Sequence, residues 1–331
     1  MGHAIKMQRL RIIIPLLFLL WPQAARAQHA LLIGGLGGTP ENTEQIRANL
    51  FGAYTAFRDR FQFPADQIVV FAERALEAES FTAGISTAEN IQAQFASLAD
   101  RVTPDDHVFV LLFGHGSFNG QRAQFNIPRR DLHDGDYAEM VGSLGAGRIV
   151  FINTTSASAP FIEALSAPER IVITATRTPS QRNRTVFPQF LVEAMHGSTA
   201  DLDKDGSLTV REVFYYAALK TAESFTASGH LATEHSLLED TGDGQGYRLE
   251  ELESAAEGNL AAITHFRRPT TLAGGQHGAG LLQGEKEKLE HSIVALKGRK
   301  ESLAEDTYYA ELEQLFVALA RLNDRIERED Q

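Results

Sequence analysis

Short apolar runs recur along the first two thirds of the chain and alternate with segments whose apolar residues have helical spacing. The runs predict strands at Ala30–Ile33, Gln67–Phe71, Val108–Phe113, Arg148–Ile152 and Ile171–Ile173. The intervening segments predict helices at Glu41–Phe57, Thr87–Ala99, Tyr137–Leu144, Phe161–Leu165 and Phe187–Met195. Unbroken apolar strands alternating with helices are typical of a mostly parallel sheet covered on both faces. We therefore predict one α/β domain over residues 28–195.

The pattern changes after residue 195. Residues 196–265 hold two Asp/Gly-rich loops set between predicted helices, and residues 266–284 form a glycine-rich segment that we expect to be a flexible linker. Residues 285–331 are charged and helical, and Gly298 allows a break between two helices. Their apolar stripes are Leu289, Ile293, Leu296 and Leu303, then Leu312, Leu315, Leu319, Leu322 and Ile326. This pattern predicts a helical hairpin, with a coiled-coil arm for self-association as the alternative.

The first 27 residues have the pattern of a secretory signal peptide. Basic residues precede the apolar run Ile12–Trp21, and Ala25-Arg26-Ala27 offers small residues before a cleavage point at Gln28. The run is about half the ~20 residues that a membrane-spanning helix needs. We expect a periplasmic or secreted protein with no membrane span after cleavage, and an uncleaved N-terminal anchor is the alternative.

Charge and cysteine content narrow the classes of function. The net charge is −12, and loss of the four basic residues of the leader would make it −16. So acidic a chain is a poor partner for nucleic acid and a good one for hard cations. The chain has no cysteine, which excludes disulfides, thiol nucleophiles and thiolate metal ligands.

The segment Asp201–Glu212 matches the calcium-binding loop of an EF-hand. Carboxylates stand at its first, third, fifth and twelfth positions, and Gly206 stands where the loop turns sharply. The predicted calcium ligands are Asp201, Asp203, Asp205, Ser207 through its carbonyl, Thr209 through a water, and Glu212. Leu208 occupies the position that packs against a partner loop.

A second acidic loop, Glu239–Glu250, matches the same pattern less well. It begins with Glu rather than Asp, and Gly246 replaces the expected apolar residue. A tight Asp-Gly turn without metal is one interpretation of this segment. Calcium in EF-hand geometry, or in an irregular site built from Asp240, Asp243 or Glu250, remains the other.

Polar residues follow two strands that a short crossover should make neighbours. His115 follows Val108–Phe113, and Thr154-Thr155-Ser156 follow Arg148–Ile152. The carboxyl ends of parallel strands gather ligands and chemistry at one edge of a sheet. A histidine beside a hydroxyl could activate it as a nucleophile.

The order strand, His115-Gly116, crossover, strand and polar motif resembles the caspase/legumain type of cysteine peptidase over residues 29–195. The resemblance implies that His115 is the general base and that Ser156, or Thr155 after a shift of one residue, stands at the position of the catalytic cysteine. It also implies a substrate pocket near Arg177, where Arg182 and Arg184 follow. A serine needs a better-oriented base than a thiol does.

Two functions follow from these residues. The first is an exported calcium-binding protein with a peptidase-like domain that has lost activity and binds or scaffolds a protein or peptide partner. The alternative is an atypical hydrolase that uses Ser156 (or Thr155) with His115.

Overall fold

The computed structural model describes residues 27–77, 82–255, 257–266 and 277–329. All of the predicted signal peptide except Ala27 lies outside these residues. The strands are β1 Gln28–Gly34, β2 Ile68–Ala72, β3 Leu76–Glu77, β4 Thr82–Ile85, β5 His107–Phe113, β6 Gly116–Phe118, β7 Ala123–Phe125, β8 Leu132–His133, β9 Arg148–Asn153, β10 Arg170–Thr174 and β11 Leu237–Glu239. The helices are α1 Pro40–Thr55, α2 Ala88–Ala99, α3 Asp134–Gly142, α4 Pro160–Leu165, α5 Phe187–His196, α6 Val210–Ala227, α7 Asn259–Ala262, α8 His277–Gly298 and α9 Glu305–Glu329.

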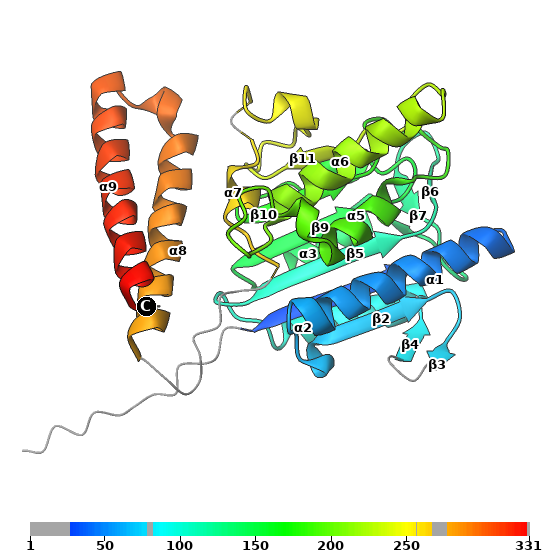
Figure 1. Ribbon diagram of the computed structural model, residues 1–331. Helices are drawn as coiled ribbons and strands as arrows, with labels where there is room; N and C mark the ends of the chain where they lie inside the picture. The colour runs from blue at the N-terminus through cyan, green and yellow to red at the C-terminus, as the bar shows by residue number, and fades with distance from the viewer. Residues whose placement is uncertain (1–26, 78–81, 256, 267–276, 330–331) are drawn as a thin grey trace, which may run out of the picture.

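The main sheet has the strand order β11-β10-β9-β5-β1-β2-β4-β3 (Figure 1). The inner pairs, β10–β9, β9–β5, β5–β1, β1–β2 and β2–β4, are all parallel. Only the two outermost strands, β11 and β3, run antiparallel to their neighbours. The predicted mostly parallel α/β sheet is therefore confirmed, and β6–β8 form a small separate antiparallel sheet.

Alternate side chains of each inner strand enter two different cores, as period-2 geometry requires. In β5, Phe109 and Leu111 join the core under α1, α5 and α6, whereas Val108 and Val110 join the core under α2, α3 and α4. Burial on both faces explains why these strands are unbroken apolar runs in the sequence.

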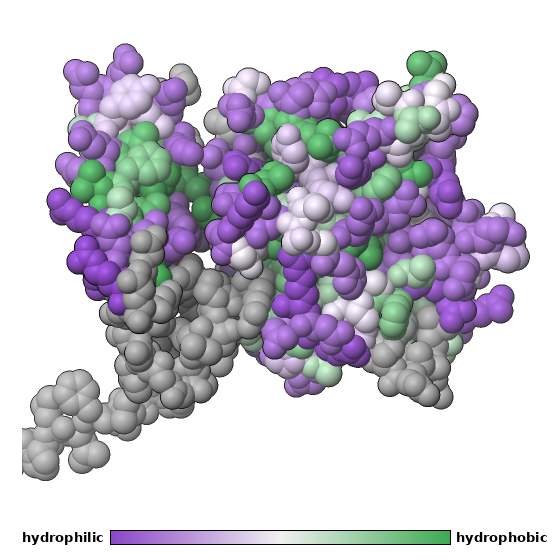
Figure 2. Space-filling view, viewed as in Figure 1, coloured by the Kyte–Doolittle hydropathy of each residue, from purple (hydrophilic) through white to green (hydrophobic). Residues whose placement is uncertain are grey.

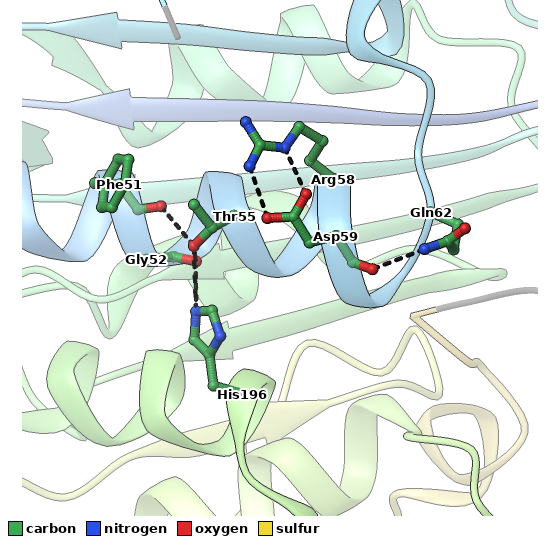
Figure 3. A network of polar contacts seen from close by, with 7 residues as sticks. All are labelled: Phe51, Gly52, Thr55, Arg58, Asp59, Gln62 and His196. Carbon is green, nitrogen blue, oxygen red and sulfur yellow. Dashed lines mark hydrogen bonds and ion pairs between the residues drawn. The ribbon is translucent and has the colours of Figure 1, made fainter. Parts of the chain in front are cut away.

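Helix α5 is held closely against α1 (Figure 3). The side chain of His196, at the end of α5, contacts the Gly52 carbonyl at 2.8 Å and the Thr55 hydroxyl at 3.5 Å. A Cβ at Gly52 would come within 2.4 Å of Val192, so only glycine permits this approach. A guanidinium nitrogen of Arg60 donates to three carbonyls at the C-terminus of α5, on Ala194, Met195 and Gly197. The end of α5 is therefore fixed where the first acidic loop begins.

The predicted boundary at residues 195 and 196 does not separate two folding units. Strand β11 pairs with β10 in the main sheet, and α6 packs along α5 on the same face as α1. Val213 and Phe214 of α6 are fully buried in the same core as Leu32 of β1. The acidic-loop region is therefore an extension of the α/β domain.

Helices α8 and α9 form the predicted hairpin, and α8 lies between α9 and the rest of the molecule (Figure 1). Ile293 and Leu296 of α8 are buried, and Lys297 of α8 donates to the Asn259 side chain at 3.1 Å. Helix α8 begins at His277, whereas the sequence predicted a linker up to residue 284. Residues 267–276 of that linker lie outside the described residues. No helix within the described ranges is long and apolar enough to cross a membrane.

Candidate functional site

The first acidic loop connects α5 to α6. A turn of 3₁₀ helix at Ser198–Ala200 leads into it, and Thr209 begins α6 as its N-cap. Lys204 and Gly206 both have positive φ, at +60° and +81°. These two left-handed conformations flank Asp205 and turn the backbone sharply there, and a glycine adopts such a conformation without strain.

Three of the predicted ligands converge. One carboxylate oxygen from each of Asp201, Asp203 and Asp205 lies within 4.8 Å of the others. The loop backbone donates to this trio, from Gly206 to Asp201 at 3.0 Å and from Ser207 to Asp205 at 2.7 Å. These backbone N–H groups orient the carboxylates toward one another.

Two electrostatic features set this acid trio apart from an ordinary surface cluster. The Asp201 Oδ1 atom is buried and has no hydrogen-bond partner. Burial, together with the negative charges of Asp205, Glu212 and Asp201, raises the pKa of Asp203. A carboxylate oxygen removed from water without a donor is costly, and like charges at close range add to that cost.

Glu212 and Thr209 serve a different purpose from the one that the sequence predicts. The carboxylate of Glu212 accepts from the Leu202 N–H at 2.8 Å and from the Thr209 N–H and hydroxyl at 2.9 and 2.8 Å. Thr209 Oγ1 in turn accepts from the Glu212 N–H at 3.2 Å, which completes a capping box. Both oxygens of the predicted closing ligand therefore already accept hydrogen bonds, one at the Leu202 N–H between Asp201 and Asp203 and the other at the start of α6.

The first loop pairs with the chain segment Thr264–Phe266, which we call the strap. The Val210 N–H donates to the Thr264 carbonyl at 2.8 Å, and the Phe266 N–H donates to the Leu208 carbonyl at 2.9 Å. The Ser207 hydroxyl lies 2.7 Å from His265 Nδ1. The sequence predicted that Leu208 packs against a partner loop. The partner is the strap, which carries no pattern that would have identified it.

The strap is anchored in an aromatic cluster. Phe266 stacks on Phe61 and Phe109, with ring centroids 5.1 and 5.2 Å apart, and is fully buried. The position of the first loop is thereby tied to the core of the α/β domain.

The second acidic loop is preceded by a strand, not by a helix, because Glu239 is the last residue of β11. A Glu239 carboxylate oxygen accepts from the backbone N–H groups of Thr241, Gly242 and Asp243. Glu239 is fully buried, and burial raises its pKa. Its carboxylate therefore serves as a hydrogen-bond acceptor for the backbone of its own turn.

Asp240 and Glu257 form a buried acid pair beside this turn. Asp240 accepts from the Gly258 and Ala261 N–H groups, both at 2.8 Å, and its own N–H donates to Glu257 at 3.2 Å. Burial and the adjacent Asp240 raise the pKa of Glu257 to about 8. These contacts fit the interpretation of Glu239–Glu250 as a structural turn.

His115 lies where the strand order reverses. Strand β1 pairs with β2 on one side and with β5 on the other, and His115 follows β5. Ligands of open α/β sheets bind at such a switch point. The His115 Nε2 atom lies 3.2 Å from the Gly37 carbonyl and 3.3 Å from Asn42 Nδ2, at the start of α1. These neighbours are more than 70 residues away along the chain, so no local pattern predicts them.

Ser156 lies close to His115, but its hydroxyl faces the backbone of Gly116. Its Oγ donates to the Gly116 carbonyl at 2.9 Å and accepts from the Gly116 N–H at 3.2 Å. Thr155 Oγ1 donates to the Ser156 carbonyl at 3.2 Å. A Cβ on Gly116 would lie 2.2 Å from that carbonyl, so the close approach needs glycine. Neither hydroxyl is hydrogen-bonded to His115 within the described part of the chain.

The three arginines after β10 are exposed. The Arg177 N–H donates to the Gln181 side chain, and Gln181 contacts His235 Nδ1 at 2.6 Å. The nearby Glu234 accepts from two N–H groups at the start of α5, and its burial raises its pKa to about 7. Neither His235 nor Glu234 was singled out from the sequence, because each contacts this loop from about 50 residues away along the chain.

Comparisons with known proteins leave the family of this chain open. No family model matches it, and no curated protein matches it. Among solved structures it is similar to a protein from Geobacter sulfurreducens determined by structural genomics, with 10% sequence identity and a TM-score of 0.41. That similarity covers 59% of this chain and 89% of the other.

Proposed function

We propose that this protein binds calcium through Asp201–Glu212, and that its α/β domain is a binding or scaffolding module without peptidase activity. The convergence of Asp201, Asp203 and Asp205, with carboxylate oxygens within 4.8 Å of one another, is the observation that carries the proposal. Three carboxylates held at this distance repel one another unless a cation or protons compensate for their charge.

The ligand atoms that the loop offers fit a hard cation. Calcium takes six to eight oxygen ligands in a flexible geometry, and this loop offers only oxygen. Asp201 would contribute the Oδ1 atom that is buried and has no donor, and Asp203, Asp205 and the Ser207 carbonyl would contribute the next oxygens. The bound ion would supply positive charge at the point where these side chains meet.

Glu212 would need to turn to complete the site. Its carboxylate accepts from Leu202 and Thr209, and these hydrogen bonds compete with a metal for the same oxygens. We therefore expect calcium binding to be accompanied by rearrangement of the first turn of α6. Loops of this kind in extracellular modules bind calcium at ~10⁻⁴–10⁻³ M, and the competition favours the weak end of that range.

The contacts of the peptidase-like residues support the absence of activity. A serine nucleophile needs a histidine that accepts its proton. Ser156 Oγ instead donates to the Gly116 carbonyl, and His115 Nε2 lies against the Gly37 carbonyl. The resemblance to the caspase/legumain type belongs to this proposal, as does export of the chain through a cleaved leader. A hydrolase that uses Ser156 or Thr155 would first have to exchange these hydrogen bonds.

Thermal unfolding with and without calcium tests the metal site. We expect the melting temperature in several millimolar calcium to exceed that in chelator, because a ligand at several times its dissociation constant adds about 1 kcal/mol of stability. Asp203→Asn should remove the difference. The matched control is Asp243→Asn in the second loop, which should leave it intact. Equal melting temperatures in calcium and chelator would refute the site, and loss of the difference in Asp243→Asn would move it to the second loop.

A peptide-library digest tests the second half of the proposal. We expect no cleavage by the unmodified protein, and Ser156→Cys, which offers a better nucleophile in nearly the same space, shows whether a usable pocket persists. Cleavage by the unmodified protein that disappears in both His115→Ala and Ser156→Ala would establish the hydrolase instead.

A further inference from the structure

Helix α9 contacts the rest of the protein through one side only. Its apolar stripe faces α8, with Tyr308 and Leu322 buried there. Because α8 lies between α9 and the α/β domain, the opposite side of α9 is open (Figure 1). None of the described residues packs against that side, so a partner that covers it would be another molecule or a part of the chain that the structure does not describe.

The exposed surface of α9 carries apolar residues from its second turn to just past its middle. Tyr309, Phe316 and Val317 are 52%, 47% and 41% exposed, and Ala310 and Ala320 beside them are also exposed. Figure 2 shows apolar side chains gathered on this two-helix arm between rows of polar ones. Val317 is the midpoint of the helix Glu305–Glu329. A partner that covers this patch would therefore be centred on the helix.

The residues around Val317 form a self-complementary row, which we call the outer row of α9. Its members are all exposed and are Asp306, Ala310, Glu313, Val317, Arg321, Asp324 and Arg328. They lie 4, 7 and 11 residues on either side of Val317, and those spacings return to the same side of an α-helix. Acids precede Val317 at 4 and 11 residues, and arginines follow it at the same two spacings.

We propose that this row binds a second copy of the chain, with the two α9 helices antiparallel and a two-fold axis at Val317. Glu313 then faces the partner's Arg321, and Asp306 faces the partner's Arg328. The two hairpins together make a layer of four helices in the order α8-α9-α9-α8, and the interface uses the same patch on both copies, as two-fold dimers do. A parallel arrangement would instead set acid against acid. The dimer is independent of the calcium site.

Sedimentation of the purified protein tests the dimer. We expect a concentration-dependent dimer that Phe316→Ser with Val317→Ser shifts at least tenfold toward monomer. Leu231→Ser, at a 90% exposed leucine on the α/β domain, is the matched control and should leave the dimer unchanged. Because the proposed pairs are exposed ion pairs, high salt should weaken the dimer. A protein that stays monomeric at about 100 μM in low salt would overturn the proposal.

Cysteine cross-linking tests the orientation, and the chain suits it because it has no cysteine of its own. Under oxidation, Val317→Cys should give a cross-linked dimer. Ala310→Cys alone and Asp324→Cys alone should not, whereas a mixture of the two should, because these positions face each other across the axis. Cross-linking of every single variant with itself would show a parallel pair and contradict the proposal.

Discussion

The two acidic loops share a spacing of carboxylates and glycines but use their carboxylates differently. In Asp201–Glu212, three carboxylates meet at one point, and two of them, Asp203 and Asp205, are exposed. In Glu239–Glu250, Glu239 and Asp240 are buried and accept backbone N–H groups from their own turn or from the start of α7.

The difference comes from what precedes each loop. The first loop follows α5, so its early carboxylates project from a curled, solvent-facing segment. The second loop follows β11, and Glu239, the last residue of β11, has its side chain buried. A spacing of acids can therefore form a metal site only where some of their oxygens, such as Asp201 Oδ1, have no backbone donor.

The largest expected difference is between substitutions in the two loops, measured as loss of unfolding free energy in the absence of calcium. Asp240→Ala leaves the Gly258 and Ala261 N–H groups buried without an acceptor, and we expect a loss of about 2–4 kcal/mol. Asp203→Ala should cost less than about 0.5 kcal/mol in chelator, as for a surface substitution. Urea unfolding in chelator measures both. Similar losses in the two variants would remove the distinction between the loops.

The pH dependence of stability should report the acid pair of the second loop. The pKa of Glu257 is about 8 in the folded protein, above its usual 4.5, so folding favours the protonated carboxyl. The stability from Glu257 is present in full below about pH 4.5 and is lost as the pH rises toward 8.

Glu257→Gln should therefore flatten the fall in stability between pH 5 and 8, by up to about one proton per molecule. Urea midpoints of both proteins across this range give the difference, which cancels the titration of other groups. Parallel curves would mean that Glu257 has an ordinary pKa.

Glu212 is the one carboxylate of the first loop that is used like those of the second. Glu212→Ala removes a capping box, and we expect it to cost about 1–2 kcal/mol even in chelator. Asp205→Ala, in the same loop but without a cap to lose, serves as the control. If Glu212→Ala lowered the free energy of unfolding only when calcium is present, Glu212 would act as a metal ligand and not as a helix cap.

The smallest effect should come from Ser207→Ala. The substitution removes the contact with His265 but keeps the backbone carbonyl that we assign to calcium. We expect a loss of about 0.5–1.5 kcal/mol in stability and a calcium response like that of the unmodified protein. A calcium response that disappears would show that the contact of Ser207 with the strap, not its carbonyl, matters for binding.

The sequence predicted the elements whose evidence is local. Runs such as Val108–Phe113 became buried strands within one or two residues, and the helix predicted from Thr87 is α2, with Thr87 as its N-cap. The three aspartates of the first loop converge, as their spacing around the sharp turn at Gly206 predicted.

The remaining features depend on pairs that are distant along the chain. The pairing of β11 with β10, the strap against Leu208 and the position of Asn42 beside His115 have no periodic signature. Ser156 was predicted near His115, and it is near, but the direction of its hydroxyl is set by the backbone of Gly116. Side-chain directions of this kind depend on packing that neighbouring residues do not encode.

The late return of the chain to the sheet bears on how the protein is made. Strand β10 ends at Thr174, and its partner β11 begins about 60 residues later, at Leu237. At a synthesis rate of about 5–20 residues per second, β10 waits roughly 3–12 s on the ribosome for the strand that closes its edge. An unpaired strand edge is a template for association with other chains. Nascent chains of this protein should therefore be most vulnerable to aggregation during that interval, and most dependent on chaperones that cover exposed strands.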